Sequence, residues 1–276
     1  MGRRLDLAIG ILNGAIGDHL HATDNGLAIE MSVVRGAPGR RVAIFLHGLM
    51  CTEDVWALPD GSDYGSLLAR DLGYAPLYVR FNTGRAVADS GADLARLLEE
   101  LVSAEPDVEE IVLVGFSMGG LVIRSSMQIA AEAGHRWLAL VRRAFYLGTP
   151  HLGSPWERAG RAIVELLRGF DDPYARLAGE LGDLRSLGIK DLGDPQLALL
   201  PSIEHHFVAG FVDARIAAEL GDALVPLASG TNGVCGHAGA VPPAHVKIMP
   251  GLAHMTLAHH PDVYAHIRAW CEAEAA

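Results

Sequence analysis

The residues from Glu110 to Gly120 place a serine between a buried strand and a helix, and they constrain the fold more than any other stretch. The run 111–114 is apolar and β-branched without polar alternation, which is typical of a strand covered on both faces of a parallel sheet. In Gly115-Phe116-Ser117-Met118-Gly119, glycines two residues either side of Ser117 allow strand and helix to approach closely around a strained turn. We therefore predict that this turn lifts the Ser117 hydroxyl out of the sheet. Helix 118–133 should direct its N-terminal amides toward that hydroxyl.

Length and charge restrict the classes of protein to consider. The 276 residues, 50% of them hydrophobic, are enough for one domain over 1–276 with an insertion. The formal net charge of −11 argues against nucleic acid or an anionic membrane surface as the main partner. We find no apolar run of about 18 residues, the length needed for a transmembrane segment. The sequence leaves the oligomeric state open.

The N-terminal residues 1–12 superficially resemble a signal peptide. Asp6 interrupts their apolar run, and no small-x-small cleavage site follows cleanly. We therefore expect an amphipathic N-terminal helix and a cytoplasmic protein, with a secreted or periplasmic location as the alternative.

The three cysteines, Cys51, Cys235 and Cys271, are widely separated and show no Cys-x-x-Cys spacing. This pattern argues against a zinc site and leaves one disulfide open without indicating it. We expect neither a metal nor another cofactor.

Strands and helices alternate along the chain. Expected strands are an edge strand at 27–34, then 41–46, 74–81, 111–114, 143–147, 205–209 and 245–249. Helices are expected from Ser90, after Ser117 and at the C-terminal end. This alternation implies an α/β fold with a mostly parallel central sheet flanked by helices, whose sites lie at the carboxyl ends of the strands.

About fifty residues separate Leu147 from the strand at 205, too many for a simple connection. Ser154-Pro155-Trp156-Glu157 is a capping box with proline at the first helical position, and Asp172-Pro173 begins a second helical pattern. We expect segment 151–204 to form a helical cap or lid above Ser117. The alternative is that its helices pack on the flank of the sheet.

A serine nucleophile requires a base, and the base requires an acid that fixes its tautomer. In this topology the order along the chain is nucleophile, acid, histidine. Asp213 and Asp222 are the two candidate acids. We favour Asp222 because the tight turn 221–226 lets its carboxylate reach a histidine, whereas Asp213 reads as an ordinary helix cap.

His254 is the candidate base because it lies on the loop after the last expected strand, just before the terminal helix. His259 and His260, beside Pro261, are interpreted as surface and capping residues. The other histidines before or inside strands are assigned to packing or solvation: His205, His206, His237 and His245.

Oxyanion stabilisation requires two backbone N–H groups directed at the carbonyl oxygen of the acyl group. Met118, directly after the nucleophile, supplies one, and the loop after strand 41–46 supplies the other, for which we favour Leu49. We expect His47 to shape this loop through its ring.

These residues together resemble the α/β-hydrolase fold, and more narrowly the bacterial lipases and the lipase-like esterases related to the inositol deacylases of GPI anchors. The resemblance spans Val42 to Trp270. Its motifs are Phe45-Leu46-His47-Gly48-Leu49, Gly115-Phe116-Ser117-Met118-Gly119-Gly120, Gly148-Thr149-Pro150-His151-Leu152-Gly153-Ser154, Gly221-Asp222-Ala223-Leu224-Val225-Pro226 and Ala253-His254. It implies an α/β-hydrolase domain with a helical cap inserted after the sixth strand, and it supports Asp222 as the acid.

The chain departs from that resemblance at one position. Many such lipases hold a calcium ion with an aspartate two residues after the catalytic histidine, where this chain has Thr256. We therefore predict no such site. Clear signs of a signal peptide and a disulfide are also lacking, which favours plain ester hydrolysis over activity on long-chain triglycerides.

The sequence thus predicts a cofactor-free serine hydrolase of carboxylic esters, with Ser117, His254 and Asp222 as its catalytic triad. Its expected substrate is a small-molecule or lipid ester. Two alternatives remain: acyl transfer to an alcohol or thiol on the same triad, and a non-catalytic protein whose apolar cap binds lipid.

Overall fold

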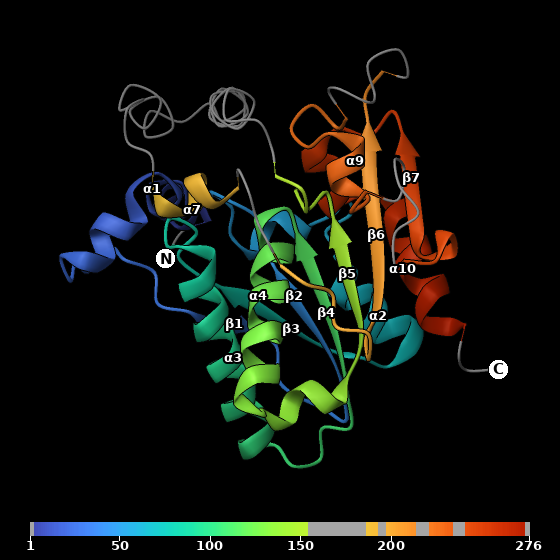
Figure 1. Ribbon diagram of the computed structural model, residues 1–276, viewed down its shortest axis with the longest axis horizontal. Coiled ribbons are helices and arrows are strands. Elements are labelled where there is room, and N and C mark those ends of the chain that lie inside the picture. The colour runs from blue at the N-terminus through green and yellow to red at the C-terminus, as the bar shows by residue number, and fades with distance from the viewer. Residues whose placement is uncertain (1–2, 154–185, 193–196, 214–220, 234–240, 274–276) are drawn as a thin grey trace.

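A mostly parallel seven-stranded sheet forms the centre of the computed structural model, which describes residues 3–153, 186–192, 197–213, 221–233 and 241–273 (Figure 1). The strand order is β1-β3-β2-β4-β5-β6-β7. The strands are β1 (Ser32–Arg35), β2 (Arg41–Leu46), β3 (Ala75–Arg80), β4 (Glu110–Phe116), β5 (Val141–Leu147), β6 (Glu204–Phe211) and β7 (Val246–Pro250). Only the β1–β3 pair among them is antiparallel. This arrangement confirms the predicted α/β sheet.

Helices cover both faces of the sheet. In Figure 1, α3 (Val87–Ala104) and α4 (Met118–Ala133) lie in front of the strands, and α2 (Tyr64–Leu72) and α10 (Pro261–Glu272) lie on the other side. The remaining described helices are α1 (Arg3–Ala22), η1 (Glu53–Trp56), η2 (Arg136–Leu140), α7 (Leu187–Asp191), α9 (Leu227–Gly230), η3 (Pro243–His245) and η4 (His254–Ala258).

Two apolar layers explain why the central strands carry no polar alternation. Along β2, Val42, Ile44 and Leu46 belong to the core shared with α3 and α4. The intervening Ala43 and Phe45 belong to the core on the α2 and α10 face. Because successive side chains of a strand point to opposite faces, burial of both faces requires an uninterrupted apolar run.

The N-terminal helix α1 packs beside the carboxyl ends of the strands, together with the short helix α7 (Figure 1). Its residues Ile11 and Ala15 form a buried cluster with Met50 and Ile189. The predicted N-terminal helix is therefore present, and it extends to Ala22 with a break in helical geometry at Ile16.

Some boundaries differ from those predicted. The edge strand expected at 27–34 is Ser32–Arg35. The helix expected to open at Ser90 begins at Val87, whose N–H donates to Asp191 Oδ2 at 2.7 Å. This cap lies 104 residues away in the sequence, so no local pattern indicates it. Helix α2 was not anticipated, although Asp63 and Ser66 form a capping box at its start.

Most of the segment expected to form a cap, 154–185 and 193–196, lies outside the described residues. The segment follows β5, the fifth described strand in chain order rather than a sixth. Helix α7 belongs to it, and Ser186 Oγ, directly before α7, donates to Gly14 O of α1 at 2.8 Å.

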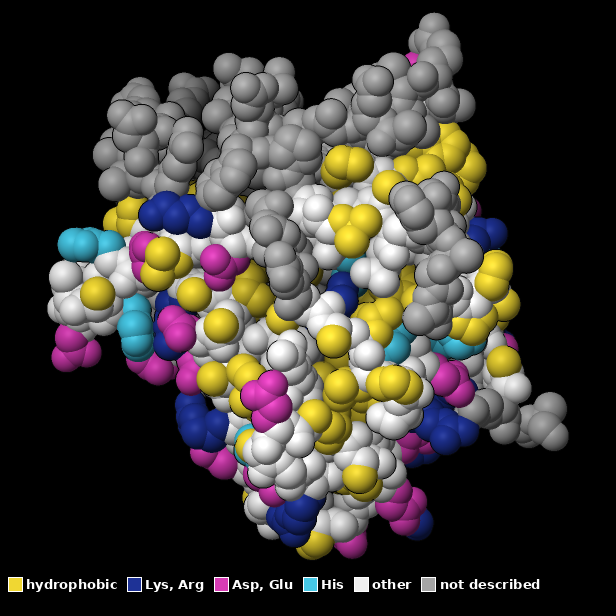
Figure 2. Space-filling view, in the orientation of Figure 1, with side chains coloured by type: hydrophobic (Ala, Val, Ile, Leu, Met, Phe, Trp, Pro, Cys, Tyr) yellow, Lys and Arg dark blue, Asp and Glu magenta, His cyan; other side chains and the backbone are white. Residues whose placement is uncertain are grey.

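Two surface properties bear on partners. No helix in the described part of the chain has the length and apolarity required to cross a bilayer. On the face shown in Figure 2, the acidic and basic side chains are interspersed rather than gathered by sign.

Candidate active site

Ser117 occupies a strained turn between β4 and α4. Its backbone angles, φ 51° and ψ −121°, lie outside the regions that L-residues ordinarily adopt. A side chain at Gly115 would place a Cβ 2.6 Å from Gly120 Cα, and one at Gly119 would place it 2.6 Å from His47 O. The Ser117 N–H donates to Leu147 O of β5 at 2.8 Å. The turn at the carboxyl end of β4 therefore depends on the two glycines singled out in the sequence.

His254 and Asp222 form a buried hydrogen-bonded pair near the end of the sheet. His254 Nδ1 lies 2.8 Å from Asp222 Oδ2, and the backbone N–H of His254 donates to Asp222 O at 2.9 Å. The other carboxylate oxygen, Oδ1, accepts from the N–H groups of Leu224 at 3.0 Å and Val225 at 2.8 Å. The turn after β6 thus fixes the carboxylate, and the carboxylate orients the imidazole.

The imidazole of His254 packs against the residues that hold the Ser117 turn. Its ring centroid is 5.0 Å from that of Phe116, the residue before Ser117. A Cβ added at Gly148, the residue after Leu147, would lie 3.1 Å from His254 Cε1 and Nδ1. The ring therefore lies beside the Ser117 turn from the side of β5.

Among the described residues, the His254 side chain makes a hydrogen bond to Asp222 but none to Ser117 Oγ. Catalytic hydrogen bonds are often long in free enzymes and tighten when substrate binds. Asp213, the other candidate acid, lies two residues beyond the end of β6. Of the two acids, the structure brings Asp222 to His254.

The loop after β2 approaches Ser117 closely. A Cβ added at Gly48 would lie 3.0 Å from Ser117 Cβ. Farther along the loop, the amide of Met50 donates to Thr83 Oγ1 at 3.1 Å and that of Cys51 donates to Gly48 O at 3.2 Å. These two amides are engaged, so Leu49, directly before them, is the candidate donor from this loop. Met118 is the first residue of α4, where N–H groups have no intrahelical acceptor.

His47 is fully buried and supports this loop. Its ring stacks on Phe81 at 4.6 Å, its Nε2 accepts from the Phe81 N–H at 3.3 Å, and its Nδ1–H donates to Gly48 O at 3.0 Å. Burial lowers the pKa of His47 to about 4. The ring is therefore neutral at neutral pH and holds the backbone at Gly48, in the role predicted for it.

A second buried pair, which the sequence did not indicate, joins α4 to the loop after β5. An Arg124 nitrogen lies 2.6 Å from His151 Nδ1, and the same nitrogen donates to Asn232 Oδ1 at 3.2 Å. The other terminal nitrogen donates to Leu197 O. Burial, and then the positive charge of Arg124, hold the pKa of His151 well below its usual value. His151 is thus a neutral acceptor for a buried guanidinium.

Three further histidines take part in packing or helix capping. His205 Nε2 donates to Leu200 O at 3.0 Å and its Nδ1 accepts from the Tyr146 hydroxyl at 2.9 Å, while burial lowers its pKa to about 4. His206 packs against the rings of Phe145 and Trp270. His260 caps α10 by accepting from the Asp262 N–H at 3.2 Å, which confirms its predicted capping role. His237 lies outside the described residues.

The described residues hold no group of three metal-ligating side chains arranged for a metal ion. Cys51 and Cys271 are buried free thiols. Cys235 lies outside the described part of the chain.

Comparisons with known proteins bear on the fold. At the level of sequence, no family model and no curated protein matches this chain. Among solved structures, it is similar to the mature form of a lipase from Bacillus licheniformis, with a TM-score of 0.57, 18% identity, and coverage of 87% of this chain and 95% of that chain.

Two further structures are similar to a comparable degree. A carboxylesterase from Bacillus subtilis gives a TM-score of 0.55 at 15% identity, covering 96% of this chain and 99% of that one. An α/β-hydrolase fold protein from Chitinophaga pinensis gives 0.53 at 14% identity, covering 86% and 91%. The chain therefore has the α/β-hydrolase fold, as its sequence motifs predicted. The narrower resemblance to inositol deacylases of GPI anchors stays a prediction.

Proposed function

We propose that this protein hydrolyses carboxylic esters with Ser117 as the nucleophile, His254 as the general base and Asp222 as the group that orients it. The observation that carries the proposal is the buried His254–Asp222 hydrogen bond of 2.8 Å beside the strained turn of Ser117. The structural neighbours named as a lipase and a carboxylesterase support the same reaction class.

In the first half of the reaction, His254 Nε2 takes the hydroxyl proton as Ser117 Oγ attacks the ester carbonyl carbon. The oxygen of the tetrahedral intermediate accepts hydrogen bonds from the N–H groups of Leu49 and Met118. When the intermediate collapses, the bond from carbon to the alcohol oxygen breaks. His254 returns its proton to that oxygen, and the free alcohol leaves an acyl group on Ser117.

In the second half, water attacks the acyl carbon and gives a proton to His254. The bond to Ser117 Oγ breaks, the proton returns to Oγ, and the carboxylic acid leaves. Throughout, Asp222 Oδ2 accepts from His254 Nδ1–H and stabilises the imidazolium that forms in each half. The two amides that hold Asp222 Oδ1 keep the carboxylate from rotating away.

A panel of p-nitrophenyl esters from acetate to palmitate tests the proposal. The wild-type protein should release p-nitrophenol, and Ser117→Ala should lower kcat by a factor on the order of 10⁶. Ser126→Ala is the matched control. Ser126 is a buried serine of α4, the helix that follows Ser117, and its hydroxyl donates to Ile123 O at 2.8 Å. Undiminished turnover by Ser117→Ala would remove the assignment. Product analysis with added alcohols separates hydrolysis from acyl transfer.

A further inference from the structure

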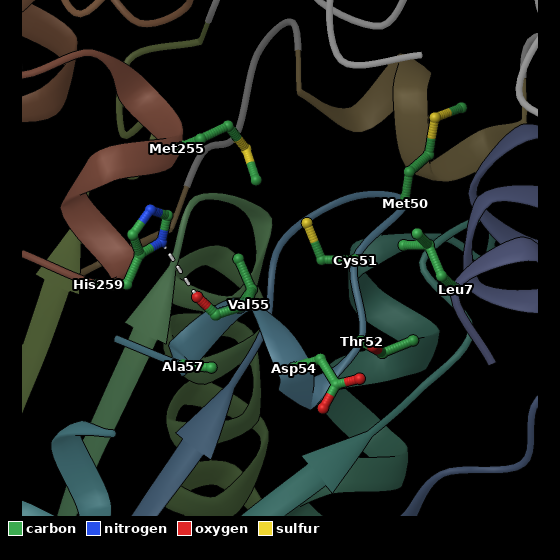
Figure 3. A pocket seen from close by; sticks show the side chains of 9 residues that line it. All are labelled: Leu7, Met50, Cys51, Thr52, Asp54, Val55, Ala57, Met255 and His259. Carbon is green, nitrogen blue, oxygen red and sulfur yellow. Dashed lines mark hydrogen bonds between the residues drawn. The ribbon is translucent and has the colours of Figure 1, made fainter. Parts of the chain in front are cut away.

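A mostly apolar cavity of about 280 Å³ is lined in part by Met50 and Met255, which directly follow the candidate site residues Leu49 and His254. In Figure 3, Met255 and His259 face Met50 and Leu7 across it, and the dashed line is the hydrogen bond from His259 Nδ1 to Val55 O at 3.2 Å. The cavity is therefore built from three separate regions: helix α1, the loop after β2, and the residues after β7. Its lining consists of Leu7, Met50, Cys51, Thr52, Asp54, Val55, Ala57, Met255 and His259.

The cavity borders the position where the reacting ester group would sit. Met50 directly follows Leu49, the candidate oxyanion donor, and Met255 directly follows His254, the candidate base. Ser117 is approached by Gly48 from the first of these loops and lies beside the His254 ring from the second. A substituent of the ester that extends away from Ser117 between these two loops therefore points toward the cavity.

The direction of proton transfer decides which half of the ester this is. His254 must give its proton to the alcohol oxygen when the first intermediate collapses, so that oxygen lies at the imidazole. The alcohol part then continues past Met255, the next residue. We propose that this cavity receives the alcohol part of the ester, and that Leu7 of α1 closes it and limits the size of that part. This inference rests on the proposed function.

Helix α1 is anchored well enough to act as such a limit. Arg80 pairs with Asp6 of α1 at 3.3 Å and with Glu53 at 2.8 Å, so one arginine ties the helix to the segment after the loop. Leu7 also packs against the buried cluster that contains Met50. A wall held by ion pairs and apolar packing sets a defined boundary.

Most of the cavity lining is apolar, from Leu7, Met50, Val55, Ala57 and Met255, and Asp54 is the one carboxylate among the described residues that line it. Burial raises the pKa of the Cys51 thiol to about 12, so this side chain is neutral at neutral pH. An apolar cavity of about 150 Å³ holds benzene, so a cavity of about 280 Å³ accommodates an apolar group of roughly ten carbon atoms. The expected substrates are esters whose alcohol part is apolar and has up to roughly ten carbon atoms.

Substitutions at Leu7 test the wall, and Leu5 supplies the control. Leu7→Trp should shorten the cavity and Leu7→Ala should lengthen it. Leu5 lies on the same helix but is 50% exposed and does not line the cavity, so Leu5→Trp and Leu5→Ala make matching changes of volume elsewhere. Thermal unfolding of all four variants shows whether each one folds.

Two ester series then separate the halves of the substrate. In acetates of primary alcohols from ethyl to tetradecyl, Leu7→Trp should lower kcat/KM for the decyl ester at least tenfold relative to the ethyl ester. Leu7→Ala should move the longest accepted alcohol upward, and the Leu5 variants should match the wild type. In ethyl esters of increasing acyl length, all variants should keep the wild-type profile. A Leu7-dependent shift in the acyl series instead, or in neither series, would overturn the inference while leaving the proposed function intact.

Binding of 1-alkanols to Ser117→Ala gives a readout without turnover. The affinity should rise about fourfold per methylene, the equivalent of burying one methylene, up to roughly ten carbons. Adding Leu7→Trp should lower the affinity for 1-decanol at least tenfold, whereas Leu5→Trp should not. Absence of binding, or binding insensitive to Leu7, overturns the inference. Leu7-dependent binding by a protein that hydrolyses no ester would instead contradict the proposed function and retain the cavity as a site for apolar alcohols.

Discussion

Two buried histidines near the carboxyl ends of the strands have partners of opposite charge. His254 is paired with the carboxylate of Asp222, and His151 is paired with the guanidinium of Arg124. Both residues are almost completely buried, with exposed fractions of 5% for His254 and 1% for His151. Burial therefore does not distinguish the two histidines. They differ in the charge of the side chain with which each is paired.

The partner decides what each ring can do with a proton. A carboxylate stabilises the imidazolium, which a general base must form. A guanidinium opposes it, and burial with the Arg124 charge lowers the pKa of His151. The first pair is suited to proton transfer. The second holds the loop after β5 against α4 without taking up a proton.

The largest expected effect comes from removing the carboxylate of the first pair. Asp222→Asn keeps the size of the side chain but no longer fixes the tautomer or stabilises the imidazolium, so kcat for a p-nitrophenyl ester should fall about 10⁴-fold. Steady-state kinetics measure this change. Asp213→Asn, at the other candidate acid, is the control and should keep kcat within about twofold. The reverse pattern would transfer the role of acid to Asp213.

A third buried histidine extends the comparison to pH. His206 packs against the rings of His245 at 4.3 Å, Trp270 at 4.7 Å and Phe145 at 5.0 Å, and among the described residues neither of its ring nitrogens has a hydrogen-bond partner. Burial, followed by the charges of His245 and Arg143, lowers its pKa to about 3. Glu204 Oε2 lies 3.6 Å from its Nε2, within ion-pair distance, but burial and the neighbouring positive groups prevail and the pKa is lowered.

Because the folded-state pKa of His206 lies below the unfolded value of about 6.5, its contribution to stability is present above pH 6.5 and is lost as the pH falls toward 3. At pH 4 the loss should reach about 3 kcal/mol. His206→Phe removes this proton linkage and no hydrogen bond. Urea unfolding at pH 7 and pH 4 should show a smaller acid loss for the variant, and an equal loss in both proteins would contradict the assignment.

The smallest expected effect comes from breaking the pair formed by His151 and Arg124. His151→Phe leaves the buried Arg124 guanidinium with one acceptor fewer and should lower the free energy of unfolding by about 2 kcal/mol. Adding Arg124→Met removes the stranded charge and should restore at least half of that loss, because a buried pair replaced as a whole costs less than a broken one. Urea denaturation measures both. Additive losses would show that the two side chains do not form an energetic pair.

The contrast between the two pairs also shows which features of the site could be predicted from the sequence. The strand, the glycines and the helix around Ser117 are local, so the turn was predictable from 11 consecutive residues. Chain order and turn chemistry then led to Asp222 and His254. The Arg124–His151 pair joins positions 27 residues apart through tertiary packing. No sequence pattern within α4 indicates that its buried arginine has a partner.

The same limit applies to the elements around the site. The cap that Asp191 gives to α3, and the wall that Leu7 gives to the cavity, depend on where distant segments come to lie. Periodicity predicts that α1 is a helix but not which loop it packs against. Local turns and chain order therefore led to Asp222 and His254, which are hydrogen-bonded in the structure, whereas the residues around the cavity come together only through tertiary packing.

Reaction with a fluorophosphonate tests most directly whether Ser117 is activated by the His254–Asp222 pair. The account predicts a single covalent adduct on the peptide that contains Ser117, absent in Ser117→Ala and formed far more slowly in Asp222→Asn, as measured by mass spectrometry over time. An adduct on another residue, or labelling of Asp222→Asn at the wild-type rate, would contradict it.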